Sequence, residues 1–362
     1  MRIISFTLFT SVLIAGFTFL FSQDKVEPLR LIHADLLKRE IVGHQIVQKL
    51  EGNVKFQQGS TTMKCDLATQ FLGRSEAAMI GNVQIFDESK SLYADTVNFY
   101  QKERIQIAVG KVKSITDSDT TTADRMIYYE EHNKIVSQGN VRIISPKERR
   151  ILTGGYAEYQ RSEEYGKIFQ NPVLMQFDSL GTEIMRIIAD TIEIYDGGER
   201  TFMIGNVQII KPGIKAKCGK AEYIDPAEKI ILNENPQVWR SNQQISGDTL
   251  LLFLKDSKLI RAQVIGKALA ISDADTLNRG RWVNKLTGQT MDFSFNNQKL
   301  EKVIVENQAT SMYHIIEDGQ YKGSNEVSGD KIMLFFSQGE VTRVLVNSEP
   351  EVSSGIYLPP HF

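Results

Sequence analysis

Aspartates recur along the chain in one sequence context, and their carboxylates are the side chains best placed to do chemistry. All but Asp292 follow a small residue or a glycine, and alternating apolar positions come after them, as in Ala94-Asp95-Thr96-Val97-Asn98-Phe99. Stacked carboxylates can bind calcium, as in nonapeptide β-rolls, but that motif needs closely spaced Gly and Asp residues. A structural role, in which each aspartate accepts backbone N–H bonds at a bend, is therefore favoured. The series comprises Asp66, Asp95, Asp124, Asp190, Asp248, Asp292 and Asp330.

A second recurring motif, Gly-Asn-Val, alternates with the aspartates. It is clearest at Ile80-Gly81-Asn82-Val83-Gln84-Ile85 and returns at Gly52, Gly139 and Gly205, with a weaker copy at Gly110. The glycines at 52, 81, 110 and 139 recur every 29 residues, and a fixed period of this size indicates a repeat architecture. Because Gly and Asn both tolerate positive φ, the motif predicts a backbone bend rather than a ligand site.

The segments between these motifs predict strands. Their period-two alternation is typical of strands with one buried face, and turn signals such as Gln58-Gly59-Ser60 and Asp87-Glu88-Ser89 separate them. Each repeat would hold two runs of about a dozen residues, and a glycine within such a run marks a bulge or bend. The sequence therefore predicts an all-β fold, an elongated open β-jellyroll in which two facing antiparallel sheets of kinked strands enclose an apolar interior.

Inward-facing positions follow from the alternation, and together they could line one long apolar slot for an extended lipid chain. For any single residue, a closed dry core is the alternative interpretation, and a one-residue slip would reverse its direction. The expected lining residues are Val54, Phe56, Val83, Ile85, Val97, Phe99, Met126, Tyr128, Val141, Ile143, Ile192, Ile194, Val207, Ile209, Leu250, Leu252, Ile332 and Leu334.

No catalytic, metal or cofactor motif accompanies this pattern. None of the five histidines lies within metal-ligand spacing of another histidine or a cysteine, and no P-loop, dinucleotide or nucleophile-elbow motif occurs. Two carboxylates would suffice for a glycosidase, but no acid stands apart from the repeat. The chain is therefore expected not to be an enzyme.

Cys65 and Cys218 occupy equivalent positions in repeats that are far apart along the array. We therefore expect them to be small buried residues rather than a disulfide pair.

Composition and the N-terminal residues limit the partners and the location expected for the protein. The formal net charge of −2 gives no bulk attraction to nucleic acid, and a hydrophobic content of 41% excludes a disordered chain. Residues 1–23 begin with Arg2 and continue as an apolar run, which predicts a secretory signal peptide, although an uncleaved anchor is also possible. Residues 24–49 are expected to form a lead-in strand region, 50–348 one continuous repeat array, and 349–362 a C-terminal tail.

The motifs carry a family resemblance. Gly-Asn-Val followed by Ala-Asp-x-Val-x-Phe-Tyr resembles the repeat of the OstA/LptA family of lipopolysaccharide transport proteins, and Gly329-Asp330-Lys331-Ile332-Met333-Leu334-Phe335-Phe336 is similar to another form of it. The resemblance covers most of residues 50–346. It implies a β-jellyroll open along one side, in the periplasm, with lipopolysaccharide acyl chains against its interior.

The resemblance also implies partners. These are lipopolysaccharide, an inner-membrane transporter component, an outer-membrane translocon, and a further copy of the chain stacked end to end. The rival interpretations are a structural or polysaccharide-binding β-solenoid at the cell surface and an enzyme of β-helix type.

Overall fold

The structure is a computed structural model that describes residues 29–42, 45–71, 73–225, 227–255, 258–275, 280–317, 319–338, 340–349 and 353–360. The expected signal peptide lies outside these residues. The described chain divides into two units. The N-terminal unit comprises the residues up to Ile184 together with Asp190–Gly198, and the C-terminal unit comprises Met185–Ala189 and the residues from Glu199 onward. That residues 50–348 form one continuous array stays a prediction, and the units are described separately.

The described residues form strands and two short 3₁₀ helices, which confirms the all-β prediction. The first strands are β1 (Arg30–His33), β2 (Leu36–Val42), β3 (Gln45–Gln58), β4 (Thr61–Phe71), β5 (Glu76–Phe86), β6 (Ser91–Tyr100), β7 (Ile105–Ile115), β8 (Thr120–Tyr129), β9 (Lys134–Ser145) and β10 (Arg150–Gln160). Next come η1 (Arg161–Glu163), β11 (Tyr165–Phe169), β12 (Val173–Phe177), β13 (Glu183–Ile188), β14 (Thr191–Tyr195) and η2 (Asp196–Gly198).

The later strands vary more in length, and four of them, β21 to β24, exceed the expected dozen residues. They are β15 (Arg200–Lys211), β16 (Ile214–Ile224), β17 (Lys229–Asn233), β18 (Gln237–Arg240), β19 (Gln243–Ser246), β20 (Thr249–Lys255), β21 (Lys258–Asp273), β22 (Val283–Asn296), β23 (Lys299–Glu317), β24 (Gln320–Ser337), β25 (Glu340–Asn347) and β26 (Ser354–Leu358). β26 lies inside the segment expected to be a tail. It pairs with β24, so this part of the segment is ordered as a strand.

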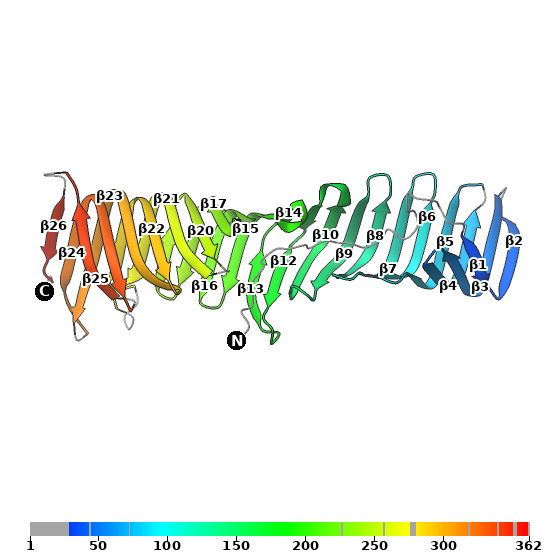
Figure 1. Ribbon diagram of the computed structural model, residues 1–362, viewed down its shortest axis with the longest axis horizontal. Coiled ribbons are helices and arrows are strands. Elements are labelled where there is room, and N and C mark those ends of the chain that lie inside the picture. Colours follow the sequence, from blue (N-terminus) through cyan, green and yellow to red (C-terminus); the bar gives the residue numbers. More distant parts are fainter. Residues whose placement is uncertain are drawn as a thin grey trace. The chain divides into compact units, whose positions relative to one another are not determined.

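Successive strands within each unit pair as antiparallel hairpins (Figure 1). The pairing shifts register where the motif glycines lie. Between β5 and β6, Ile80 pairs with Thr96 and Val83 with Ala94, so Gly81 and Asn82 together oppose Asp95. Two residues opposite one define a β-bulge, which bends the strand. Gly81 and Asn82 have φ of 77° and 46°, and the other Gly-Asn steps at 52, 139 and 205 repeat these values closely. The predicted bends are therefore confirmed.

The bends divide each unit into two layers that pack face to face. In the N-terminal unit, layer A contains segments such as 76–80, 96–100 and 105–109, and layer B contains 83–86, 91–94 and 112–115. In the C-terminal unit, layer A contains 249–255, 258–265, 290–296, 299–306, 331–337 and 340–347. Its layer B contains 243–246, 268–273, 283–288, 309–317, 320–329 and 354–358. The bulge turns the buried alternation of both layers toward one shared interior.

The motif aspartates hold the bends from the neighbouring strand. The carboxylate of Asp66 lies over Gly81, where a Cβ on the glycine would come within 2.4 Å of Oδ2. The same oxygen accepts a 2.8 Å hydrogen bond from the Asn82 side-chain amide. Asp124 accepts an equivalent bond from Asn140 at 2.9 Å. The aspartates were expected to accept backbone N–H bonds. At these bends the donor is instead the asparagine side chain of the next strand.

Two bends exchange these roles. At Gln170-Asn171-Pro172 and Glu234-Asn235-Pro236 the strand is interrupted, since proline cannot donate to the ladder. Gly219 occupies the position that an aspartate has at the other bends. The Glu234 carboxylate of the following strand lies over it, so that a Cβ added at Gly219 would be 2.2 Å from Glu234 Oε2. A carboxylate over a glycine is thus retained, with the two residues on opposite strands.

The small residues before the aspartates face the interior at each bend. Ala94 and Ala123 are buried there, and a Cβ on Gly247 would lie 2.4 Å from the Val264 side chain. Cys65 and Cys218 take the same position and are both free and buried, as expected. Burial raises the pKa of each thiol to about 11.

Candidate functional site

The interior of the C-terminal unit opens into a cleft of about 160 Å³ between its two layers. The layer A wall is wholly apolar and is made by Phe293, Leu300, Val303, Leu334, Phe336 and Val341. These side chains come from β22 to β25, where alternate residues face inward. The fully buried Val305 and Ala309, on either side of the β23 bend, close the interior there. The cleft therefore opens at the edge away from the bends.

The layer B wall is more polar than the sequence predicted. Ile245, Ala270, Ile271, Leu286, Met312 and Tyr313 supply its apolar part. Inward positions near the ends of β19, β21 and β22 are polar, since Gln243 pairs with Ser272 and Ser272 with Asn284. These three side chains also line the cleft, together with Ser311. The cleft thus has one apolar wall and one wall that becomes polar toward its opening.

The interior of the N-terminal unit is closely packed at the corresponding strands. Val83, Ile85, Val141 and Ile143 are each 1% exposed, so the layers leave these side chains almost no contact with solvent. Polar side chains are buried at the layer B ends of its strands: Ser114, Asp119, Thr121, Ser145, Arg150 and Gln176. Ser145 donates a hydrogen bond to Asp119, and Arg150 forms an ion pair with Glu148. These contacts occupy the strand ends that are equivalent to those lining the cleft opening on layer B of the C-terminal unit.

The structure places the predicted lining residues inward. Fourteen of the eighteen are buried. Phe56, Phe99, Ile209 and Leu252 are half-buried. Only Leu334 among the eighteen lines the cleft, and the others pack within the layered interior. That any of them contacts a lipid stays a prediction. Sequence reasoning missed the other cleft residues because their repeats are longer and less regular, although the alternation of Phe293 with Met291 was available as a signal.

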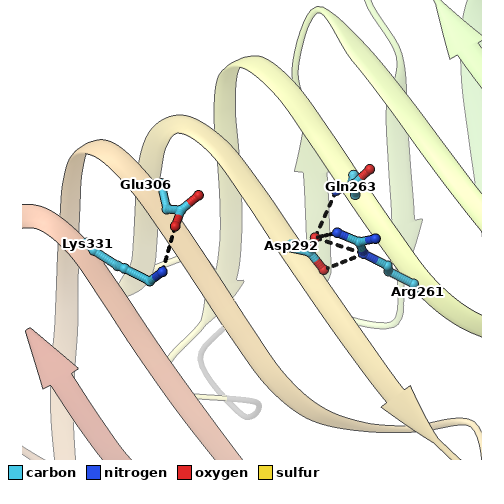
Figure 2. A network of polar contacts seen from close by, with 5 residues as sticks. All are labelled: Arg261, Gln263, Asp292, Glu306 and Lys331. Atoms are coloured by element: carbon cyan, nitrogen blue, oxygen red, sulfur yellow. Dashed lines mark hydrogen bonds and ion pairs between the residues drawn. The ribbon is translucent and has the colours of Figure 1, made fainter.

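The outer face of the C-terminal unit holds cross-strand polar pairs (Figure 2). Asp292 accepts hydrogen bonds from Arg261 at 2.9 and 3.0 Å and from Gln263 at 2.9 Å. Lys331 pairs with Glu306 at 2.7 Å. Burial alone would raise the pKa of Asp292, but the hydrogen bonds from Arg261 and Gln263 and the nearby positive charge outweigh it and lower that pKa. Asp292 thus departs from the other motif aspartates and stabilises the sheet surface.

Within the part of the chain that the structure describes, no cluster of three or more His, Cys, Asp or Glu side chains could hold a metal ion. No helix among those residues is long and apolar enough to span a membrane.

Large apolar side chains are exposed on the first and last strands. On β1 and β2 they include Leu31, Leu37 and Ile41, the last 77% exposed. On β25 and β26 they are Val341, Val344, Leu345, Val346, Ile356, Tyr357 and Leu358. β25 and β26 both pair with β24, and β1 and β2 both pair with β3. Each pair therefore ends the ladder of its unit with apolar side chains in solvent.

Bent antiparallel hairpins in two layers, with an apolar interior that opens at one edge, define an all-β jellyroll-type protein. Residues 120–258 match the family model described as "LptA/(LptD N-terminal domain) LPS transport protein". This match confirms the resemblance to the OstA/LptA family that the repeats indicate. The matched segment ends at Lys258, so most cleft residues lie beyond it.

One solved structure that matches is that of LptH from Pseudomonas aeruginosa, described as the LptA homologous periplasmic component of the conserved lipopolysaccharide transport device. It is 17% identical, the match covers 40% of this chain and 95% of that chain, and the TM-score is 0.31. No curated protein matches the chain.

Proposed function

We propose that the protein is a periplasmic component of lipopolysaccharide transport that shields acyl chains from water in the cleft of its C-terminal unit. The family matched over residues 120–258 is described as a transport protein and not as an enzyme, which supports the general role. The observation that supports the proposed acyl-chain site is the cleft itself. Its layer A wall offers six apolar side chains and no polar group.

The physical argument is the cost of wetting an acyl chain. Burial of apolar surface stabilises by roughly 25 cal/mol per Å², so a chain gains most where both it and the wall leave water. An enclosed apolar cavity of about this size stays dry and accepts apolar guests, and the layer A wall presents the same kind of surface to an acyl chain. The polar positions on layer B, such as Gln243 and Asn284, lie where a chain would meet its headgroup.

Docking of partners is proposed at the terminal strands. Edge strands with exposed apolar side chains are templates for pairing with another chain, and peptide recognition often adds a strand to such an edge. The exposed residues of β1, β2, β25 and β26 would then contact a second copy or the transport components at the inner and outer membranes.

Photo-cross-linking tests the proposed slot. A photo-reactive residue replaces Phe336, which lines the cleft, or, as matched control, Met333 on the outer face of the same strand. With lipopolysaccharide present, cross-linked lipid is expected at position 336 and not at 333. Capture at both positions or at neither would contradict the proposal. Capture of a lipid-free glycan at 336 would favour the polysaccharide-binding alternative.

A further inference from the structure

A row of cations and aromatic rings crosses the outer face of layer A in the C-terminal unit. The strand register places Lys229 beside Phe253 and Phe253 beside Arg261. Arg261 lies beside Ser294, and Ser294 beside Lys302. Lys302 then pairs with Phe335, and Phe335 with Arg343. We call the seven residues Lys229, Phe253, Arg261, Ser294, Lys302, Phe335 and Arg343 the basic row.

Each phenylalanine of the basic row lies between two cations. The Lys229 ammonium is 5.4 Å and the Arg261 guanidinium 5.7 Å from the Phe253 ring centre. For Phe335 the distances are 5.6 Å to Lys302 and 4.2 Å to Arg343. Cations within about 6 Å of a ring face are attracted to it, which orients them while leaving N–H donors available.

The charges of the row are spaced regularly and are mostly of one sign. The cations lie on β17, β21, β23 and β25, which are every second strand of layer A, so neighbours are about 10 Å apart at roughly 4.8 Å per strand. One carboxylate, Asp292, lies in the adjacent cross-strand row and is held by Arg261. The strand tips beyond the row carry both signs, with Lys255, Lys258, Lys299, Glu228 and Glu301. Positive charge therefore prevails along the row itself.

The row runs along the back of the apolar cleft wall. Phe335 lies between Leu334 and Phe336, which both line the cleft, and Lys302 precedes Val303, which lines it too. Successive residues of a strand face opposite sides. The row is also close to the hairpin tips, since Arg261 and Lys302 are each the fourth residue of their strands. Long cationic side chains are thus placed near the open margin of the apolar wall.

We propose that the basic row binds the phosphate groups of an anionic amphiphile whose acyl chain lies in the cleft. This inference rests on the proposed function and extends it from chain to headgroup. A chain against layer A leaves its headgroup at the margin where these cations lie. Lys and Arg donate charge-assisted hydrogen bonds to phosphate oxygens, and the regular spacing suits a headgroup with more than one phosphate.

The test compares diphosphorylated lipid A with its dephosphorylated form on the full chain. Affinity is measured by displacement of a fluorescent apolar probe at 50 and 200 mM NaCl. The triple variant Lys229→Gln, Lys302→Gln, Arg343→Gln keeps Arg261 and its pair with Asp292. It is expected to lose at least about tenfold in affinity for the diphosphorylated lipid, with a weaker salt dependence, and to bind the dephosphorylated lipid as the parent does.

Two control variants separate charge from structure. Lys64→Gln removes a cation 5.5 Å from the Phe86 ring in the N-terminal unit and should change neither affinity. Lys229→Arg with Lys302→Arg retains the charges and should bind as the parent does. Circular dichroism checks that each variant is folded.

The outcomes distinguish this inference from the proposed function. Equal losses for both lipids in the triple variant, or no loss for either, would overturn the basic row as a phosphate site. A parent chain that binds both lipids equally also overturns it but leaves the proposed function standing. A parent chain that binds neither lipid refutes both. Undiminished binding of the diphosphorylated lipid after the cleft is filled with Leu286→Trp would show that the phosphates bind without an acyl chain in the cleft, and would overturn the proposal.

Discussion

At the scale of single residues, the bends depend on a glycine, an asparagine and a carboxylate from the neighbouring strand. At the Asp66 bend, φ of 77° at Gly81 is a conformation that other residues adopt only with strain. The carboxylate occupies the space that a side chain at Gly81 would need, and it also binds Asn82. The three groups therefore specify one another.

Substitution of Gly81 tests this dependence. Gly81→Ala should lower the free energy of unfolding by about 2–3 kcal/mol, because positive φ and the 2.4 Å approach to Asp66 both oppose a Cβ. Gly73→Ala is the control, since nothing lies within 4 Å of the Cβ it would add. Urea unfolding measures both. In the double variant Gly81→Ala, Asp66→Ala the total loss should be smaller than the sum of the single losses, and simple additivity would argue against the contact.

The two thiols make a prediction about pH. Their folded pKa of about 11 lies above the usual value because the thiolate is disfavoured by burial. A raised folded pKa means that the stabilisation is complete below the unfolded pKa near 8.5 and is lost as pH rises toward 11. The free energy of unfolding should therefore fall over this pH range, and less so in the Cys65→Ala, Cys218→Ala variant.

The accessibility of the two thiols gives a second test. At pH 7.5, a thiol reagent should label the native chain only as fast as it unfolds, and rapid labelling would contradict the burial.

At the scale of strands, two bends reach the same contact by another route. Gly219 and Glu234 exchange the places of carboxylate and glycine, and the strand is broken by Pro236 between β17 and β18. The backbone still connects the bend, because the Gly219 N–H donates to the Glu234 carbonyl at 2.9 Å. This bend and the Gly81 bend therefore share one feature, a carboxylate over a glycine, although different strands supply the two residues.

An exchange of residues should therefore restore the more frequent arrangement. Gly219→Asp alone is expected to destabilise by about 2 kcal/mol, since its Cβ would lie 2.2 Å from the Glu234 carboxylate. Adding Glu234→Gly removes that clash and places glycine at φ of 63°, so the double variant should recover most of the loss. Unfolding in urea gives the coupling between the sites. A double variant less stable than Gly219→Asp would show that the two bends are not equivalent.

The sequence predicts features that depend on residues next to one another in the chain, and it does not predict contacts between strands. The bulge follows from Gly81 and Asn82 alone, so the bends and the alternation of Val83 and Ile85 were predictable. The bond from Asn82 to Asp66 was not, because it joins residues on neighbouring strands whose register is set by hairpin pairing. The polar layer B wall was missed for a similar reason. Gln243, Ser272 and Asn284 come from three segments, and only their pairing shows that they share one face.

At the scale of the whole molecule, the two units share one strand pattern but differ in their interiors. In the N-terminal unit the layers meet, and buried polar groups such as Asp119 with Ser145 occupy the layer B ends. In the C-terminal unit β21 to β24 are longer and the layers leave a cleft. An apolar chain gains free energy by entering existing space, whereas entry between tightly packed layers would require separating Val83, Ile85 and Val141 from their neighbours. Ligand binding should therefore begin in the C-terminal unit.

Amide hydrogen exchange on the full chain can locate this difference. Adding diphosphorylated lipid A should slow exchange in β21 to β24, which contribute both walls of the cleft, because a bound chain opposes local opening of the strands it contacts. Exchange in β5 to β9 should remain as it is without lipid, since their interior is already filled. The Leu286→Trp variant, which fills the cleft, supplies the matched control and should abolish the slowing in β21 to β24. Equal slowing in both units would mean that the N-terminal layers separate to admit lipid, and the assignment of binding to the C-terminal cleft would then be wrong.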